Sequence, residues 1–434
     1  MTSSSSSLRN GGWPVAADVR PLHRWPWTVL TALALASLLP GFLLGEDTSG
    51  GARYDFLTFH WPAAQLFADE PTAQALREYS SATTPLQHML LGALPWVHDP
   101  AAYRLTGLVL GAAALLAFAV AVQRRFCRVW PGYEMAALAA AAVALSPGFR
   151  SATFWGDTDA LPLLFSAGAC LLLHDPRSGT WRTRATAGRV IAIALLGAAA
   201  FYTRQLYVFV PALSFWLLWS RQACSRLFLL GVFGATALPA LYLFLIWGGL
   251  TPPRFRQAPT IESLLYVPVL VAPFALPFLF ARSPRDWRLP SGRTIAGVLA
   301  TVGVMTVLFG GVTLTPLGGG LLTKIGLLLG PLGVPFMILA ASLGWWAIAT
   351  CIASGADHAV LFGFAVGPLL LPGFFYQRYI DPLAFTIVLM FASPPLAARI
   401  VTQRAIVAGY VFFLGLEIIG LVWFGLLGHV GPSA

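Results

Sequence analysis

Long apolar stretches, separated by short polar segments, recur along the chain from about Trp27 to Leu427. A helix needs about 20 mainly apolar residues to cross a bilayer, and inside lipid its backbone satisfies its own polar groups. The pattern therefore predicts an all-α, polytopic transmembrane bundle of about 11–13 spans over residues 26–430. The polar residues 1–25, which include a serine run, predict a disordered cytoplasmic tail.

The predicted spans differ in length, and the third to sixth are short for a membrane crossing. They begin near Pro26, Ala101, Gly132, Asp157, Ala187, Arg204, Arg226, Glu262, Thr294, Gly330, Asp357, Arg378 and Arg404.

The polar segment between the first two spans, residues 46–100, is acidic and is the longest of its kind. Within it, residues 59–67 have apolar positions at helical spacing, which predicts an amphipathic helix lying in the membrane interface. Residues 85–97 are apolar but too few to cross the bilayer, so they predict a second interfacial or re-entrant helix.

Charge orients the predicted spans. The chain is 57% hydrophobic and 10% charged, and its basic residues are all arginine except Lys324. They gather in every second loop, so the positive-inside rule makes that side cytoplasmic, with the N-terminus inside and the C-terminus outside. The net charge of +10 comes from loop anchors rather than from a basic groove, which argues against a nucleic-acid partner.

Four arginines lie at predicted span edges on the non-cytoplasmic side, where basic residues should be scarce: Arg150, Arg204, Arg254 and Arg378. Snorkelling of single side chains toward the interface is the simpler explanation for any one of them. A set on one face favours a common role, and arginine pairs bidentately with phosphate. An anionic lipid head group is therefore the expected partner.

Three aspartates lie on the same side. Asp55 follows the first span among aromatic residues, and Asp157 and Asp159 open the fourth span. Helix capping explains the latter two equally well, and an ordinary loop carboxylate explains the first. A carboxylate facing arginines also fits glycosyl transfer from a lipid phosphate, in which a base activates the acceptor hydroxyl and cations bind the leaving phosphate.

Several short segments, in the same order, resemble the GT-C superfamily of polyprenyl-phosphate-sugar glycosyltransferases, and most closely its dolichyl-phosphate-glucose α-1,2-glucosyltransferase family. Asp55 and the segment 59–65, Phe-His-Trp-Pro-Ala-Ala-Gln, look like the acidic first-loop motif of that family. The other similar segments are Thr-Thr-Pro at 83–85, Asp-Thr-Asp-Ala at 157–160, Phe-Tyr-Thr-Arg-Gln at 201–205 and Gln-Arg-Tyr at 377–379 with Pro382.

The resemblance implies a GT-C-like fold, residues 46–100 as the catalytic loop, and inverting transfer on the non-cytoplasmic face with Asp55 as general base. It implies Arg204 and Arg378 as ligands of the donor phosphate, whereas Arg150 and Arg254 join them on topology alone. The sugar and acceptor pockets would be lined by His60, Asp157, Asp159, Tyr202 and Tyr379. A divalent cation is compatible with the superfamily, but the sequence shows no firm set of metal ligands.

This chain departs from the family pattern in two ways. Its first-loop acid is a single aspartate, one residue farther from His60 than the family places it, and Asp159 stands where the family has glutamate. The donor sugar, for which the resemblance suggests glucose, and the acceptor, a lipid-linked glycan or another molecule, therefore stay open.

The expected localisation is an integral membrane protein of a bacterial inner membrane, since arginine, glycine and alanine abound. A transporter or flippase of a lipid-linked or anionic solute is the alternative function, although no internal repeat supports it. A scaffold protein is a third, which charges in apolar surroundings argue against.

Overall fold

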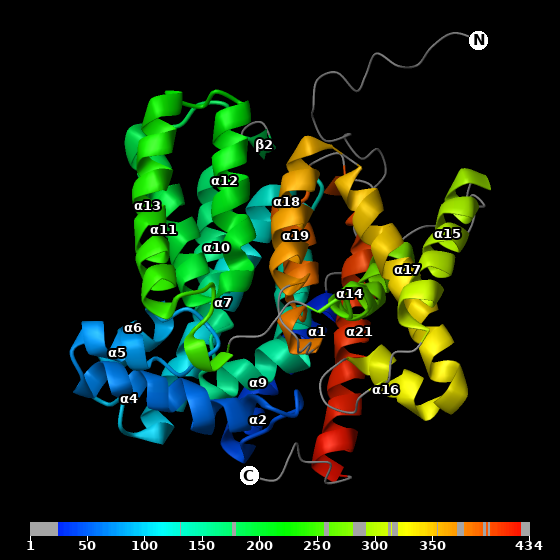
Figure 1. The fold of residues 1–434 in the computed structure, drawn as a ribbon, viewed down its shortest axis with the longest axis horizontal. Helices are drawn as coiled ribbons and strands as arrows, with labels where there is room; N and C mark the ends of the chain where they lie inside the picture. Colours follow the sequence, from blue (N-terminus) through cyan, green and yellow to red (C-terminus); the bar gives the residue numbers. More distant parts are fainter. Residues whose placement is uncertain are drawn as a thin grey trace.

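The computed structural model describes residues 25–426 except 131, 176–178, 256–259, 281–291, 311–313, 315–319, 354, 371–376, 394–395 and 398–399. The predicted tail at 1–25 therefore lies outside the described residues, apart from Trp25. The described chain forms an all-α bundle, and its strands are one short hairpin of β1 (His174–Asp175) and β2 (Thr180–Trp181). The all-α prediction is confirmed (Figure 1).

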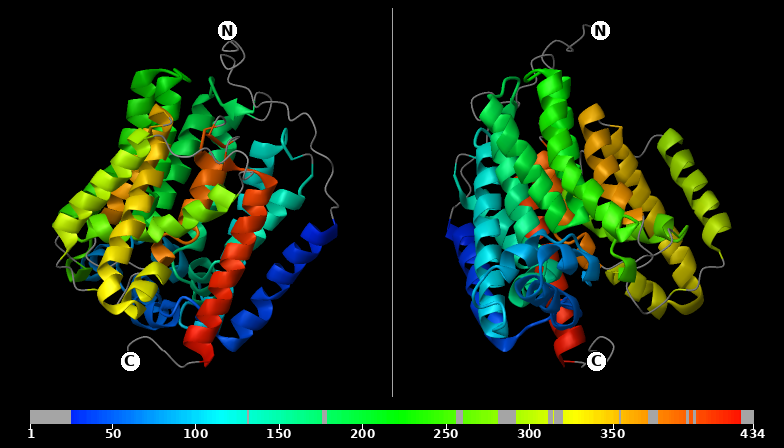
Figure 2. Two further views of the ribbon diagram at one scale, coloured as in Figure 1. Left: turned by 90° about the vertical axis from the view of Figure 1, so that its right-hand side faces the viewer. Right: turned by 60° about the vertical axis from the view of Figure 1, so that its left-hand side comes forward.

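The long helices run side by side along the bundle (Figures 1 and 2). On one side of Figure 1 lie α7 (Pro100–Phe126), α10 (Ala160–Leu173), α11 (Ala187–Thr203), α12 (Phe209–Ser220) and α13 (Arg226–Trp247). The remainder of the bundle consists of α1 (Trp25–Ala36), α8 (Glu134–Ala144), α14 (Ser263–Phe280), α15 (Gly292–Phe309), α16 (Leu321–Leu328), α17 (Gly333–Ile352), α18 (Ala356–Val366), α19 (Leu383–Phe391) and α21 (Gln403–Gly420).

Short helices gather at one end of the bundle, opposite the end where β2 lies (Figure 1). They are α2 (Leu38–Leu44), α3 (Ala52–Asp55), a π-helical turn η1 (Phe56–His60), α4 (Trp61–Asp69), α5 (Thr72–Glu78), α6 (Leu86–Gly92) and α9 (Pro147–Trp155). The helices predicted at 59–67 and within 85–97 are both present. Single turns η2 (Gln205–Val208), η3 (Pro253–Phe255), η5 (Gly330–Leu332), η6 (Gly367–Leu370), η7 (Gln377–Tyr379) and η8 (Leu421–Leu426) connect the longer elements.

Among the described residues, five helices are long and apolar enough to cross a membrane, and a bent pair raises the number to six. The pair is α8 and α9, which meet at an angle of 71° near Ser146 and Pro147. Six further apolar helices have 10–17 residues, so most spans predicted beyond these are shorter than a full crossing. The apolar pattern does not reveal such breaks, because apolar residues continue through a bend.

Large apolar side chains cover the outside of the long helices. Leu227 and Leu245 of α13 are 81% and 72% exposed, and Val307 of α15 is 86% exposed. A water-soluble protein seldom displays contiguous apolar patches of this kind. Together with the long apolar helices, they identify an integral membrane protein whose solvent is lipid.

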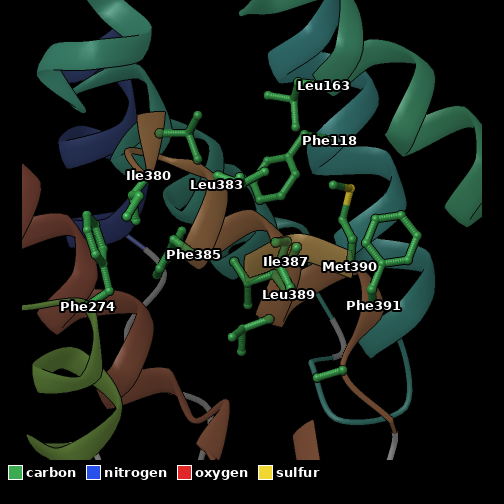
Figure 3. Packing of buried hydrophobic residues seen from close by; sticks show 14 of the residues in the cluster. Phe118, Leu163, Phe274, Ile380, Leu383, Phe385, Ile387, Leu389, Met390 and Phe391 are labelled. Carbon is green, nitrogen blue, oxygen red and sulfur yellow. The ribbon is translucent and has the colours of Figure 1, made fainter. Parts of the chain in front are cut away.

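Helix α19 runs through the interior of the bundle and positions the turn before it. Leu383, Phe385, Ile387 and Met390 are buried against side chains of α7, α10 and α14, as Figure 3 shows. Burial of each such side chain stabilises the fold by about 1.5–3 kcal/mol. Since η7 directly precedes α19, this packing holds η7 against α9 at the end where the short helices gather.

Candidate functional site

Asp55 and Arg378 form an ion pair although 323 residues separate them in sequence. Asp55 ends α3, and Arg378 is the middle residue of η7. The Nη2 of Arg378 donates to Oδ2 of Asp55, and both side chains are largely shielded from solvent. The pair therefore joins the first polar loop to the segment that leads into α19.

A second ion pair lies beside the first. Arg204, at the end of α11, donates to the carboxylate of Asp159, and both groups are nearly buried. The ring of Tyr379 lies within reach of both arginines, with its centroid 5.5 Å from the Arg204 guanidinium carbon and 6.0 Å from that of Arg378. Asp159 is the N-cap residue of α10, but its side chain makes no capping hydrogen bond, so the capping explanation does not hold for it.

The π-helical turn η1 brings Asp55 and His60 to one face. In a regular α-helix, residues five apart point about 140° away from each other, because each residue turns the helix by 100°. In η1 the backbone N–H of Trp61 donates to the carbonyl of Phe56, five residues back, which widens the turn. Consequently, Asp55 and His60 face the same carboxylate, Asp157, from one side.

His60 belongs to a buried chain of hydrogen bonds. Its Nδ1 lies 2.9 Å from Nε2 of His88, and Nδ1 of His88 lies 2.6 Å from the hydroxyl of Tyr79. Burial, followed by the nearby Arg378 and Arg204, lowers the pKa of His60 to about 3, and burial lowers the pKa of His88 as well. Both imidazoles are therefore neutral at pH 7, and the 3.8 Å approach of His60 to Asp157 is not an ion pair.

Asp157 is buried without a hydrogen bond to one of its oxygens. Its side chain is 4% exposed, and among the described residues Oδ1 has no hydrogen-bond partner. Burial, reinforced by the charge of Asp55, raises the pKa of Asp157 above its ordinary value. The backbone beside it is fixed by Gln87, whose Nε2 donates to the carbonyls of Gly156 and Asp157 at 3.0 Å each.

Two glycines allow the segments of the site to approach. A Cβ on Gly148 would lie 2.9 Å from the Cα and Cβ of Arg378, so this glycine permits α9 to contact η7. Gly156 has φ +76°, in the left-handed region, and a Cβ there would lie 2.7 Å from the ring of Tyr103. These contacts let the turn before Asp157 and Asp159 pack close to α7.

The cluster has the donor chemistry of a small cation site. One ligand atom each from Asp55, His60 and Asp157 lie within 4.8 Å of one another. Two carboxylates and a neutral imidazole suit divalent ions such as Mn²⁺ or Zn²⁺. The unsatisfied, buried Oδ1 of Asp157 fits such an ion, because a buried carboxylate oxygen needs a positive partner. The sequence shows no firm set of ligands, because the three residues come from two distant segments.

Seven predicted site residues therefore lie together: Asp55, His60, Asp157, Asp159, Arg204, Arg378 and Tyr379. Arg254 lies near them on η3, with its guanidinium carbon 5.7 Å from the ring centroid of Phe59. Arg254 is exposed, which places it at the rim of the site.

Tyr202 has a different role from the predicted one. Its hydroxyl donates to the carbonyl of Thr236 at 2.7 Å and accepts from the backbone N–H of Ala240 at 2.8 Å. Both partners belong to α13, so the hydroxyl is used in packing α11 against α13.

Arg150 is also placed differently from the prediction. Its guanidinium bonds to Glu46 through Nε at 2.6 Å and Nη2 at 2.9 Å, and its Nε lies 3.1 Å from Glu417 of α21. Ser37 accepts two further hydrogen bonds from it, and Thr48 donates to Glu417 at 2.9 Å. With its donors taken by the protein, Arg150 ties α2, α9 and α21 together rather than binding phosphate.

Sequence reasoning did not single out His88, Tyr79, Gln87 or Glu417. The first three lie in or beside the short apolar stretch at 85–97, where a polar residue on a buried face was the available signal. Glu417 was the stronger signal, since a carboxylate inside an apolar span needs a partner.

No known protein family, curated protein or solved structure matches the chain.

Proposed function

We propose that the chain is a membrane glycosyltransferase that takes a sugar, with glucose as first candidate, from a polyprenyl-phosphate donor. The acceptor is a lipid-linked glycan or another molecule on the non-cytoplasmic face. One observation carries the proposal: two ion pairs, Asp55 with Arg378 and Asp159 with Arg204, lie side by side at one end of a membrane bundle.

The arginines supply what a lipid-phosphate leaving group requires. A guanidinium has five N–H donors, so the contact that Arg204 or Arg378 makes with its aspartate leaves donors for phosphate oxygens. The aspartates hold the guanidinium groups in place, so little side-chain entropy remains to be lost when the donor binds. Donors fixed before the reaction stabilise charge that develops on the phosphate as the sugar leaves.

Asp55 is the proposed general base. The oxygen of the acceptor hydroxyl attacks the anomeric carbon, the bond from that carbon to the phosphate oxygen breaks, and Asp55 takes the hydroxyl proton. The polyprenyl phosphate leaves as an anion and needs no proton. Attack from the side opposite the phosphate inverts the anomeric centre.

The test is transfer of radiolabelled sugar from a panel of polyprenyl-phosphate sugars, in membranes containing wild type, Asp55→Asn or Asp69→Asn. Asp69 is an exposed aspartate of α4, so its variant controls for loss of one negative charge. We expect Asp55→Asn to lower transfer by about 10²–10⁴-fold, the usual contribution of a general base, and Asp69→Asn to leave it unchanged.

Three outcomes separate the possibilities. Equal transfer by wild type and Asp55→Asn removes Asp55 from the chemistry. Transfer that is lost equally in Asp69→Asn shows an effect on the protein as a whole. No transfer from any donor sinks the enzyme proposal, and uptake or flipping of a labelled lipid-linked solute in the same vesicles then favours the transporter.

A further inference from the structure

We propose that Asp55, His60 and Asp157 form a binding site for one divalent cation of the Mn²⁺ or Zn²⁺ class, with His60 oriented by His88 and Tyr79. Binding of the cation stands on the geometry alone, and its use in sugar transfer rests on the proposed function. The ligand atoms lie within 4.8 Å of one another, close enough to surround one ion.

The buried oxygen of Asp157 is the first independent observation. Oδ1 has no hydrogen-bond partner among the described residues, although the side chain is almost fully buried and faces His60 and Asp55. A buried, unsatisfied polar group costs about 1–3 kcal/mol, and more when it is charged, so such a group in a folded protein calls for a ligand or a function. A cation between the three side chains would satisfy it.

The chain His60, His88 and Tyr79 is the second observation. A histidine that binds a metal usually donates its other ring N–H to a neighbour, which fixes its tautomer. If Nδ1 of His60 donates to Nε2 of His88, then Nδ1 of His88 donates to the hydroxyl oxygen of Tyr79. This arrangement leaves a lone pair on Nε2 of His60, the atom 3.8 Å from Oδ1 of Asp157.

The charge of the site is the third. With all groups ionised, three aspartates, Asp55, Asp157 and Asp159, face two arginines, Arg204 and Arg378, which leaves one net negative charge. An anionic phosphate would be repelled by that balance, whereas a bound divalent ion changes it to one net positive charge. A carboxylate offers about four lone-pair sites, so Asp55 can contact Arg378 and the ion together.

The test measures binding of the metal itself, without substrate. Purified protein in detergent, freed of metal by chelator, is titrated with Mn²⁺ while the electron paramagnetic resonance signal of free Mn²⁺ is recorded. Competition by Zn²⁺ is measured in the same way. We expect one Mn²⁺ per chain, displaced by Zn²⁺, and at least a 10-fold loss of affinity in Asp157→Asn and in His60→Ala.

Two further variants keep the test decisive. Tyr79→Phe touches no ligand, and we expect it to weaken Mn²⁺ binding about 10–100-fold, because it removes the hydroxyl that orients His88. Asp69→Asn removes the exposed contact of Asp69 with His98, and we expect it to leave binding unchanged. Melting temperature and gel filtration establish that each variant is folded.

An adventitious ion only, seen as binding that Asp157→Asn, His60→Ala and Tyr79→Phe all leave intact, overturns the site, as does absence of stoichiometric binding to wild type. Full sugar transfer by metal-free protein overturns the role of the cation but leaves the enzyme standing. Ligand-dependent binding of one Mn²⁺ without transfer from any donor supports the cation site and counts against the glycosyltransferase.

Discussion

Arg378 combines three properties that a ligand for a lipid phosphate needs. It is held by a carboxylate, it lies near the aromatic ring of Tyr379, and it is mostly shielded from water. Shielding strengthens its interaction with an anion, because the effective dielectric constant is lower than in bulk water. Arg254 has the same charge but lies exposed at the rim, where water and salt screen it.

The two arginines should therefore respond differently to substitution. We expect Arg378→Gln to lower sugar transfer by about 10²–10³-fold per folded protein, as loss of a fixed donor to a developing charge does. Arg254→Gln should lower it less than about 10-fold, and its effect should shrink as salt is raised. Steady-state transfer rates at two ionic strengths measure both, and equal losses would contradict the assignment of Arg378 to the interior of the site.

At the scale of elements, the site depends on how closely α9 and η7 approach. The contact is made where Gly148 faces the backbone of Arg378, so the absence of a side chain at one position sets the place of the arginine. Helix α19 holds η7 from the other side through its buried apolar residues. A small displacement of η7 would move the Arg378 guanidinium away from Asp55.

A methyl group at position 148 tests this contact. We expect Gly148→Ala to lower the melting temperature and to reduce transfer, because its Cβ would lie 2.9 Å from backbone and Cβ atoms of Arg378. Gly363→Ala in α18 is the matched control, since no atom lies within 4 Å of a Cβ there. The control should leave the melting temperature unchanged or raise it, because alanine favours helix by about 1 kcal/mol over glycine. Indistinguishable behaviour of the two variants would show that the approach is not tight.

At the scale of the whole molecule, three separate helices meet at a buried network of charges. Arg150 of α9 lies between Glu46, which follows α2, and Glu417 of α21, near the opposite end of the sequence. Burial raises the pKa of Glu46, but the hydrogen bond from Arg150 outweighs it, and the pKa is lowered overall. Removal of one partner from such a buried network leaves charges without compensation.

Loss of Arg150 should consequently affect stability and not chemistry. We expect Arg150→Met to destabilise the protein by about 3–5 kcal/mol, as broken buried pairs do, while transfer per folded molecule stays near wild type. Thermal unfolding in detergent and transfer assays on the folded fraction measure the two effects. A large loss of transfer with an unchanged melting temperature would restore Arg150 to the phosphate site.

The sequence predicts the class of fold and most of the clustered side chains, but not how the chain is divided. Hydropathy reveals apolar helices, and polar residues at their edges reveal Asp55, Asp157, Arg204 and Arg378. Hydropathy does not reveal the 71° bend between α8 and α9, and it gave full crossings where many helices are short. It also misses His88 and Tyr79, whose role depends on a contact with His60 rather than on the spacing of residues.

The π-helical turn at Phe56–His60 changes how the first-loop motif should be written. A motif counted in residues sets this chain apart, since its aspartate and histidine are five positions apart, one more than in the family that it resembles. Counted in degrees around the helix axis, the extra residue is absorbed by the wider turn, and the two side chains keep a common bearing. Deletion of one residue from 56–59 would then exchange a π turn for an α turn and preserve the pair. A search that permits this one-residue insertion would recover chains of this kind that fixed spacing rejects.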